Sequence, residues 1–292
     1  MRPTLRENLT LLRKIEADLK AAHILSPEAE AETLITHFSG VRRLDFFTGE
    51  KKITLSARRS IQKALTVRKK GKPLFYLTGE APFYGRLFRV TPDTLIPRPE
   101  TEVLVEKTLD LLKTRYEGKT ADILDLGTGT GCIAVSLTLE HPDCRMTALD
   151  ASPEALRIAR KNLDLFDLRG RIRLVQSRLF DAFDKDKRRS WDIIVSNPPY
   201  VPREGWKKLS REVRSEPRLA LDGGPRGLRV VEKILDESPA FLASGGWLLM
   251  EIGDGQSVFL EKRLRSKRTF ARFDFIKDLN GIDRVLVAQK HG

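Results

Sequence analysis

The four consecutive residues Asn197-Pro198-Pro199-Tyr200, here called the NPPY motif, have side chains suited to orienting a planar nitrogen for alkylation. The Asn197 amide and the Pro198 carbonyl each supply a hydrogen-bond acceptor, and the two prolines fix φ and remove two backbone donors. An amide or exocyclic amine would donate two hydrogens there, which would draw its nitrogen toward a pyramidal geometry and free the lone pair. Positioning would do most of the catalytic work, with Tyr200 stacked on the planar group. The motif alone does not distinguish a side-chain amide from a nucleobase amine. It could also be a turn that ends a strand and has no catalytic role, since Asn-Pro favours turns.

A glycine-rich loop, residues 125–131, comes earlier in the chain and has the sequence Asp125-Leu126-Gly127-Thr128-Gly129-Thr130-Gly131. Its glycines allow a sharp turn and a close approach of the backbone to a ligand. Asp150 lies 19 residues after Gly131, where dinucleotide folds have the acid that binds ribose hydroxyls. NAD and S-adenosylmethionine both fit this pattern. The G-x-G-x-G spacing departs from the G-x-G-x-x-G of dinucleotide sites, and it favours S-adenosylmethionine.

Asp125, ahead of the glycines, is a candidate to hold the amino or carboxylate end of the methyl donor through water or backbone amides. The alternative is that its side chain only caps the loop.

Both motifs follow apolar segments that are typical of buried strands, and ligands bind beyond the carboxyl ends of strands in an open α/β sheet. From about residue 120 the pattern alternates between strand and helix, which predicts a doubly wound, mostly parallel α/β sheet. The expected strands are residues 123–126, 146–149, 172–175, 191–195 and 247–252, with a final antiparallel pair at 273–277 and 284–288, and the expected helices are residues 132–139, 152–165 and 227–235.

The chain has 292 residues, which suits two domains better than one. Residues 1–72 are predicted to be helical, with an apolar stripe at three- and four-residue steps and a Ser26-Pro27 helix start. This part has no cluster of catalytic residue types and is expected to be a small substrate-binding domain. Residues 73–100 are predicted to be a linker with a hairpin around Gly85-Arg86 and an extended Pro97-Arg98-Pro99 segment. Residues 101–292 are expected to form the catalytic domain.

The net charge of +13, from 53 basic and 40 acidic residues, favours a partner that carries phosphate. Basic residues cluster at residues 58–72 and again between Lys262 and Arg272, although solvated helix faces explain such clusters equally well. No stretch approaches the roughly 18 apolar residues of a membrane helix, and the first residues lack the apolar core of a signal peptide. Cys132 and Cys144 are expected to be packed thiols in a reducing compartment. We therefore expect a cytoplasmic protein, and the Cys/His spacing predicts no metal site.

The chain resembles the HemK/PrmC family of protein-(glutamine-N5) methyltransferases, which modify peptide-chain release factors. The resemblance covers nearly the whole length, and its order and spacing are specific. Besides the glycine-rich loop, Asp150 and the NPPY motif, the segments that carry it are residues 73–80, 83–84, 95–102, 212–217 and 220–224.

The resemblance implies a class I, Rossmann-like fold with a seven-stranded sheet behind an all-α N-terminal domain. We expect the protein to be a monomer. It implies S-adenosylmethionine as donor, held by residues 125–131, Asp150, Leu179 and Asn197, and converted to S-adenosylhomocysteine. The acceptor implied is the glutamine of the release factors' GGQ motif, held by the NPPY motif with Asn197, Pro198 and Tyr200 as catalytic residues. Arg98 and Glu100 would shape the entrance, with a purely structural lid as the alternative.

Two departures from the family pattern concern the site. Arg178 stands where members usually have an acidic residue near the adenine, so a backbone amide would have to substitute. The segment Gly223-Gly224-Pro225-Arg226-Gly227 also lacks the usual acid after its first two glycines.

Three other hypotheses remain open at this point. A DNA or rRNA adenine-N6 methyltransferase would use the same motif, although such DNA enzymes usually add a large target-recognition domain. A glutamine methyltransferase for a ribosomal protein would share the whole catalytic domain. A non-enzymatic protein that binds ribosomes or nucleic acid has only Arg178 in its favour. Weak contact of the basic clusters with nucleic acid is compatible with these three hypotheses and with a release factor methyltransferase.

Overall fold

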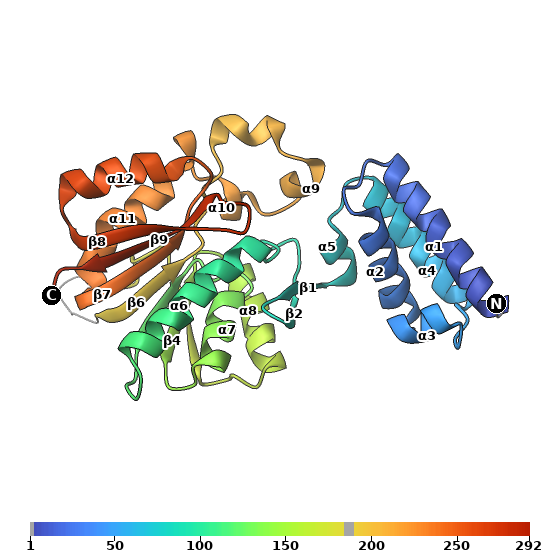
Figure 1. Cartoon of the computed structure of the whole chain (residues 1–292), viewed down its shortest axis with the longest axis horizontal. Helices are drawn as coiled ribbons and strands as arrows, with labels where there is room; N and C mark the ends of the chain where they lie inside the picture. The colour runs from blue at the N-terminus through green and yellow to red at the C-terminus, as the bar shows by residue number, and fades with distance from the viewer. Residues whose placement is uncertain (1–2, 184–189) are drawn as a thin grey trace. The chain divides into compact units, whose positions relative to one another are not determined.

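The computed structural model describes residues 3–183 and 190–292. The chain divides into two compact units (Figure 1). The helical unit is Met1–Glu80 with Ser210–Ser215, and the sheet unit is Ala81–Leu209 with Glu216–Gly292. A short segment far along the chain therefore belongs to the helical unit. The predicted domain boundaries at residues 72 and 100 did not include this segment of the helical unit. Residues 1 and 2 of the predicted N-terminal domain lie outside the described part of the chain.

The helical unit begins and ends its helices at residues that the sequence marks. Pro27 stands in the first turn of its helix and Gly40 ends it in the left-handed region at φ 66°. Thr54 caps the next long helix by accepting a hydrogen bond from the Ala57 backbone N–H at 3.2 Å. The helices are α1 Pro3–Ala21, α2 Pro27–Ser39, α3 Arg43–Thr48, α4 Leu55–Lys69, α5 Leu74–Thr78 and, from the returning segment, α9 Arg211–Arg214.

An apolar core fills the helical unit and contains the predicted stripe residues Leu12, Ile15 and Leu19. The charged side chain of Arg68 is buried beside it and is only 1% exposed. Its guanidinium donates to the Glu30 carboxylate at 2.6 and 2.8 Å and to Glu212 at 2.7 Å. A buried guanidinium needs such partners, so this cation holds α9 in the helical unit.

The sheet unit contains a seven-stranded sheet in the order β5-β4-β3-β6-β7-β9-β8. The first five strands along this order run parallel, and β9 pairs antiparallel with both β7 and β8. The seven-stranded, mostly parallel α/β sheet predicted from the sequence is confirmed. Its strands are β3 Asp122–Leu126, β4 Arg145–Asp150, β5 Ile172–Gln176, β6 Trp191–Ser196, β7 Leu242–Glu251, β8 Phe270–Lys277 and β9 Asp283–Lys290.

Helices cover both faces of this sheet because successive strand residues point to opposite sides. Ile123 and Ile193 pack in one core with α6 Glu102–Arg115, α7 Cys132–Glu140 and α8 Pro153–Leu165. Leu124 and Ile194 pack in the other with α11 Arg229–Phe241 and α12 Gln256–Lys267. Figure 1 shows these two layers around the strands.

Short elements connect the longer ones. The predicted hairpin around Gly85-Arg86 is present as β1 Glu80–Phe83 and β2 Arg86–Arg89, but the helix α5 precedes it within the segment predicted as linker. The predicted helix at residues 227–235 starts later, at Arg229. The remaining elements are η1 Pro99–Thr101, η2 Arg203–Lys208, α10 Arg218–Leu221 and η3 Pro225–Gly227.

Both cysteines are free and buried, as predicted. Burial raises the pKa of the Cys132 thiol to about 12. Within the described residues no helix is both long enough and apolar enough to span a lipid bilayer.

Candidate active site

The register of the parallel strands brings the two motifs to one edge of the sheet. Leu126 at the end of β3 pairs with Leu149 of β4 and with Ser196 of β6. Gly127 and Asn197 directly follow β3 and β6, and Asp150 is the last residue of β4, so the glycine-rich loop lies between the acidic residue and the NPPY motif. Ser196 adds a tie of its own, because its hydroxyl donates to the Leu126 carbonyl oxygen at 2.8 Å.

The glycine-rich loop folds over the end of β4. The backbone N–H groups of Gly127 and Thr128 both donate to the Leu149 carbonyl oxygen, at 2.9 and 2.8 Å. Gly127 and Gly129 have φ of 74° and 55°, where a side chain is strained, and no atom lies within 4 Å of where their Cβ atoms would be. The loop therefore presents bare backbone to open space.

Asp125 is completely buried beneath this loop. Its Oδ2 accepts a hydrogen bond from the Thr128 hydroxyl at 2.6 Å, so it does cap the loop. Its Oδ1 is also buried and has no hydrogen-bond partner among the described residues. Burial raises the pKa of the Asp125 carboxyl to about 7, and a cationic group that reached Oδ1 would favour its charged form.

Asp150 is held by backbone donors on both oxygens. Gly129 N–H donates to Oδ2 and Ser152 N–H donates to Oδ1, each at 2.9 Å. Burial nevertheless raises its pKa above the ordinary value. A carboxylate has about four acceptor positions, so Asp150 keeps capacity for ligand hydroxyls.

A cavity of about 330 Å³ lies at this edge, wholly within the sheet unit. It is lined by bare backbone, by acidic and basic side chains and by apolar ones. Of the predicted site residues, those that line it are Gly127, Gly129, Asp150, Leu179, Asn197 and Pro199.

The other predicted site residues lie outside this lining. They are Asp125, Thr128, Thr130, Gly131, Pro198, Tyr200, Arg98 and Glu100.

Asn197 is tied to a buried carboxylate through a threonine. Its Nδ2 donates to Thr101 Oγ1 at 2.9 Å, and the Thr101 hydroxyl donates to Glu251 Oε2 at 2.6 Å. Asn197 Oδ1 accepts no hydrogen bond from any described residue, so the amide keeps its acceptor for a ligand. The Pro198 carbonyl oxygen is likewise without a donor within the described part of the chain.

Tyr200 belongs to the same network. Its hydroxyl donates to Glu251 Oε1 at 2.9 Å. Burial, followed by the nearby Glu251 charge, raises the pKa of Tyr200, so the phenol stays protonated and remains a donor. The hydroxyl is therefore engaged at the base of the motif.

Two glycines hold the motif from the other side. A Cβ on Gly223 would lie 2.8 Å from the Pro199 carbonyl oxygen and 2.6 Å from that of Gly227. A Cβ on Gly227 would collide with the Tyr200 carbonyl oxygen. The segment that departs from the family pattern, residues 223–227, thus packs directly against the NPPY motif. Pro225 and Arg226 form part of the single turn η3 in this segment.

The other departure from the family pattern, Arg178, lies on the cavity wall. Arg178 and Leu179 both line the cavity, and Leu179 has a positive φ of 52°. Within the described residues the Leu179 N–H has no acceptor, which leaves a backbone donor available there. Phe180 beneath it is buried and stacks on Phe241 at 4.4 Å.

Arg98 and Glu100 differ in their surroundings. Arg98 forms an ion pair with Glu216, whose other oxygen accepts from the Ile96 N–H at 3.0 Å. Arg98 therefore pins the extended segment before η1 to the chain before Pro217, while Glu100 has no partner in the described structure.

Thr101, Glu251 and Gln256 hold the motif, and none of them was among the predicted site residues. Gln256 Nε2 donates to the Gly227 carbonyl oxygen at 3.1 Å and more weakly to that of Tyr200 at 3.3 Å. Glu251 could have been found as the single acidic residue that directly follows the apolar run Trp247 to Met250. An acid next to such a run is expected to be buried, and a buried acid is either paired or functional.

Comparison with known proteins gives two family matches. The Methyltransferase small domain matches residues 101–214 and the PrmC N-terminal domain matches residues 10–79. The release factor glutamine methyltransferase of Koribacter versatilis is 38% identical over 289 residues, 97% of this chain and 99% of that protein.

This chain belongs to the release factor glutamine methyltransferase family. The counterpart from Chlorobaculum tepidum agrees, with 38% identity over 281 residues that cover 94% of this chain and 95% of that protein. The HemK/PrmC resemblance is thereby confirmed, and with it membership of a methyltransferase family. A solved structure of the hMettl16 catalytic domain aligns with a TM-score of 0.57 at 17% identity, covering 78% of this chain and 82% of that one. At that identity the likeness concerns the fold alone.

Proposed function

We propose that this chain transfers a methyl group from S-adenosylmethionine to the side-chain amide nitrogen of the glutamine in the GGQ motif of peptide-chain release factors. One observation carries the proposal beyond the family relationship. Asn197 Oδ1, an acceptor with no donor among the described residues, belongs to a residue that lines the same cavity as Gly127, Gly129 and Asp150. An acceptor for amide hydrogens and a surface for the donor are therefore in one cavity.

The residues present fit S-adenosylmethionine. The bare backbone at Gly127 and Gly129 leaves room for the cofactor, and Asp150 has acceptor capacity for the ribose hydroxyls. Asp125 Oδ1 has no hydrogen-bond donor among the described residues, and the ammonium group of S-adenosylmethionine would supply one. The Leu179 N–H is the backbone donor that we assign to the adenine in place of the missing acid. When bound, S-adenosylmethionine supplies an electrophilic methyl group on a sulfonium.

The NPPY motif would prepare the acceptor amide. Asn197 Oδ1 and the Pro198 carbonyl oxygen would accept its two N–H hydrogens, which turns the nitrogen lone pair out of conjugation. These acceptors are preorganised, because Asn197 and Tyr200 are already hydrogen-bonded on their other side. Pro199, which lines the cavity, would exclude water. No strong base is needed before transfer, since the alkylated nitrogen loses its proton readily.

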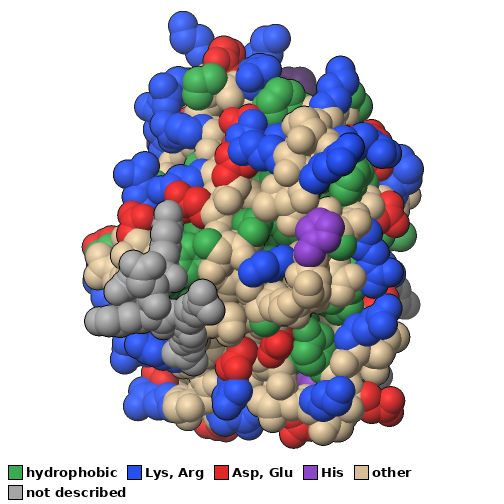
Figure 2. Space-filling model, turned by 90° about the vertical axis from the view of Figure 1, so that its left-hand side faces the viewer, with side chains coloured by type: hydrophobic (Ala, Val, Ile, Leu, Met, Phe, Trp, Pro, Cys, Tyr) green, Lys and Arg blue, Asp and Glu red, His purple; other side chains and the backbone are tan. Residues whose placement is uncertain are grey.

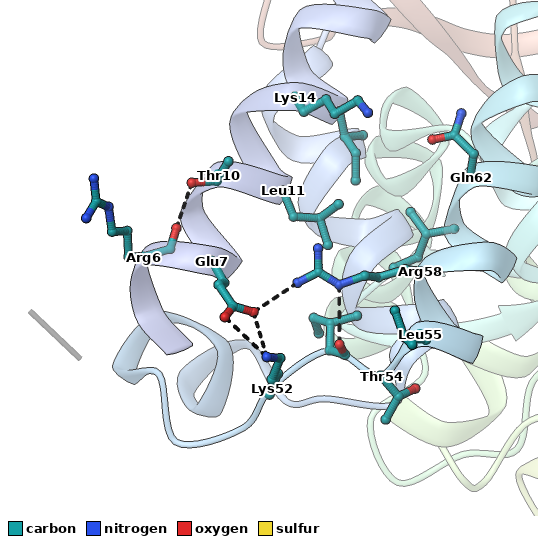
Figure 3. A pocket seen from close by; sticks show the side chains of 13 residues that line it. Arg6, Glu7, Thr10, Leu11, Lys14, Lys52, Thr54, Leu55, Arg58 and Gln62 are labelled. Carbon is teal, nitrogen blue, oxygen red and sulfur yellow. Dashed lines mark hydrogen bonds and ion pairs between the residues drawn. The ribbon is translucent and has the colours of Figure 1, made fainter. Parts of the chain in front are cut away.

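We further propose that the helical domain, residues 1–72, binds the acceptor protein. Its support is a groove of about 950 Å³ lined by α1, α4 and the segment between Lys52 and Thr54 (Figure 3). The floor is apolar, with Leu11 and Ile61, and Leu55 is 77% exposed. We assign residues 73–100 to the linker, with Arg98 and Glu100 shaping the entrance, and residues 101–292 to methyl transfer.

The charge of this groove favours an acidic protein segment. Figure 3 shows Arg58 reaching toward Glu7, which also pairs with Lys52 at 2.9 Å. Arg6 and Lys14 also line the groove, and within the described part of the chain neither has an ion-pair partner. Replacing both by Glu should raise KM for the release factor without changing the affinity for S-adenosylhomocysteine. The matched control is the double variant Arg13→Glu with Lys20→Glu, because both residues are exposed on α1 and lie outside the groove.

Half of the basic cluster near the C-terminus is paired with acids of the same protein, namely Arg263, Arg265 and Lys267. Asp236 accepts from Arg263 at 2.5 Å and from Lys267 at 2.7 Å, and Arg265 pairs with Glu261. On the face shown in Figure 2, acidic side chains are interspersed among the basic ones. We propose that nucleic-acid contact is weak and that the protein acts as a monomer in the cytoplasm, where release factors work.

The test of the function is a methyl-transfer assay with labelled donor, offering a release factor, a ribosomal protein and DNA in parallel. Label should appear in the release factor and be lost when its GGQ glutamine is replaced by alanine. Label found only in the ribosomal protein or only in DNA would overturn the proposal and identify the alternative acceptor.

A further inference from the structure

The Asn197 side chain can do its proposed work in only one orientation. Its carbonyl and amino ends have nearly the same shape but opposite hydrogen-bonding character. An acceptor amide or amine that approaches with N–H groups needs the oxygen of Asn197, whereas the rotated side chain would present an NH₂ group to another NH₂ group. The protein must therefore specify which end faces the cavity.

A single hydroxyl hydrogen settles this choice. Thr101 is 2% exposed, and its one hydroxyl hydrogen is donated to Glu251 Oε2 at 2.6 Å. The Thr101 oxygen is then only an acceptor toward Asn197, and it accepts from Nδ2 at 2.9 Å. The amino end of Asn197 is held at Thr101, so the carbonyl end remains available.

The Glu251 carboxylate, which is the last acceptor in this series of hydrogen bonds, gives the network its direction. An ionised carboxyl group only accepts hydrogen bonds, and Glu251 accepts from Thr101 on one oxygen and from Tyr200 on the other, at 2.9 Å. Glu251 is fully buried at the carboxyl end of β7, beside Asn197 because Ser196 pairs with Met250. Asn197 thus donates to Thr101, and Thr101 and Tyr200 donate to Glu251.

We propose that Thr101 and Glu251 are positioning residues that set the hydrogen-bond polarity of Asn197, so that the site accepts a nitrogen carrying hydrogens and rejects a group that only accepts. The inference rests on the proposed function. Thr101 is 2% exposed and Glu251 is 0% exposed, and hydrogen bonds join both to Asn197, so they act through Asn197 and do not touch the acceptor themselves. The same polarity would suit an exocyclic amine, and the choice of glutamine lies elsewhere.

Protonation of Glu251 would abolish this direction, because a neutral carboxyl group can donate to Thr101 and allow Asn197 to turn. The groups that act on its charge are the Tyr200 and Thr101 hydroxyls, the cation of Arg284 and the carboxylate of Glu100. Burial outweighs the favourable groups and raises the pKa of Glu251. Activity should therefore fall on the acid side at a higher pH than an ordinary glutamate would produce.

The test compares Thr101→Val with Thr101→Ser in the full-length protein and the release-factor assay. Thr101→Val should lower kcat about 100-fold, because the amide loses its orientation in the reactive complex. It should leave S-adenosylhomocysteine binding unchanged, and Thr101→Ser, which keeps the hydroxyl, should restore most of the activity. Thr108→Val is the matched control: Thr108 is equally buried on α6, but its hydroxyl donates to the Leu104 carbonyl oxygen at 2.7 Å and lies outside the network.

Glu251→Gln provides a second measurement should Thr101→Val fail to fold. It keeps the shape but replaces one acceptor oxygen by an amino group, so kcat should fall about tenfold and the acid limb assigned to Glu251 should disappear from the pH profile. Full turnover in Thr101→Val, or equal losses in the valine and serine variants, would overturn the inference. A wild-type protein that does not label the release factor would instead contradict the proposed function.

Discussion

The donor side and the acceptor side of the cavity are built in different ways. On the donor side, Asp125 binds Thr128 three residues away, and Asp150 binds Ser152 two residues away. On the acceptor side, Asn197 binds Thr101, 96 residues away, and Thr101 binds Glu251, 150 residues away. The donor side is mainly a local turn at the end of two adjacent strands, whereas the acceptor side is a few residues held in place by distant ones. Each side should therefore fail in its own way when it is mutated.

Asn197→Ala should produce the largest effect and should damage only the acceptor side. Loss of one preorganised hydrogen-bonding group costs about 100- to 1000-fold in kcat. Affinity for S-adenosylhomocysteine should largely persist, because Gly127, Gly129 and Asp150 remain in place. Steady-state kinetics and calorimetric titration measure the two quantities, and near-normal turnover would mean that Asn197 does not orient the acceptor.

Gly227→Ala should disturb the acceptor side through packing alone. The new Cβ would collide with the Tyr200 carbonyl oxygen, and such overpacking costs about 1–3 kcal/mol. Gly255→Ala is the control, since its φ of 74° is close to the 72° of Gly227 but nothing lies within 4 Å of its Cβ position. Thermal unfolding and turnover should both suffer more in the first variant, and equal effects would show that positive φ, not contact with the motif, is what matters.

Asp150→Ala should damage only the donor side. The carboxylate accepts from the Gly129 N–H and would accept ribose hydroxyls, and hydrogen bonds to a charged group are worth about 1.5–3 kcal/mol each. We expect S-adenosylhomocysteine to bind about 10- to 100-fold more weakly, with kcat near normal at saturating donor. A fall in kcat alone would place Asp150 on the acceptor side of the comparison.

The smallest predicted effect is a pH dependence of donor binding through Asp125. Its carboxyl has a pKa of about 7 in the folded protein, and a bound ammonium would favour the charged form. Below that pH, binding must first displace a proton, so affinity for S-adenosylhomocysteine should rise about tenfold between pH 6 and pH 8. Asp125→Asn should remove this dependence, and a pH-independent affinity in the wild type would exclude contact with the ammonium.

The Asp125 carboxyl group should also make folding stability depend on pH, but in the opposite direction: stability should fall as the pH rises. Because the folded pKa lies above the unfolded value of about 3.9, the folded state retains a proton that the unfolded state has lost. The contribution of Asp125 to stability is full below pH 4 and falls as pH rises toward 7. The Tm difference between wild type and Asp125→Asn, followed from pH 4 to pH 8, measures this loss.

Much of the fold could be predicted because its signals are local. Alternation of apolar segments predicted all seven strands of the sheet, and Ser26-Pro27 marked the start of a helix. The helix α6 was overlooked although Leu104, Val105, Leu109 and Leu112 have helical spacing. The short helix α5 was hidden by aromatic residues that equally favour strands, and only its packing in the helical unit favours the helix.

The sequence by itself determined the sheet, the glycine-rich loop, Asp150 and the position of the NPPY motif at a strand end, because each depends on residues close together in the chain. Only the tertiary structure decided what holds the motif. Thr101, Glu251, Gly223 and Gly227 come from three distant segments, and no spacing rule connects them to Asn197. The polarity of the Asn197 amide is likewise a property of the folded network, since the direction of a hydrogen bond depends on which partners burial has brought together.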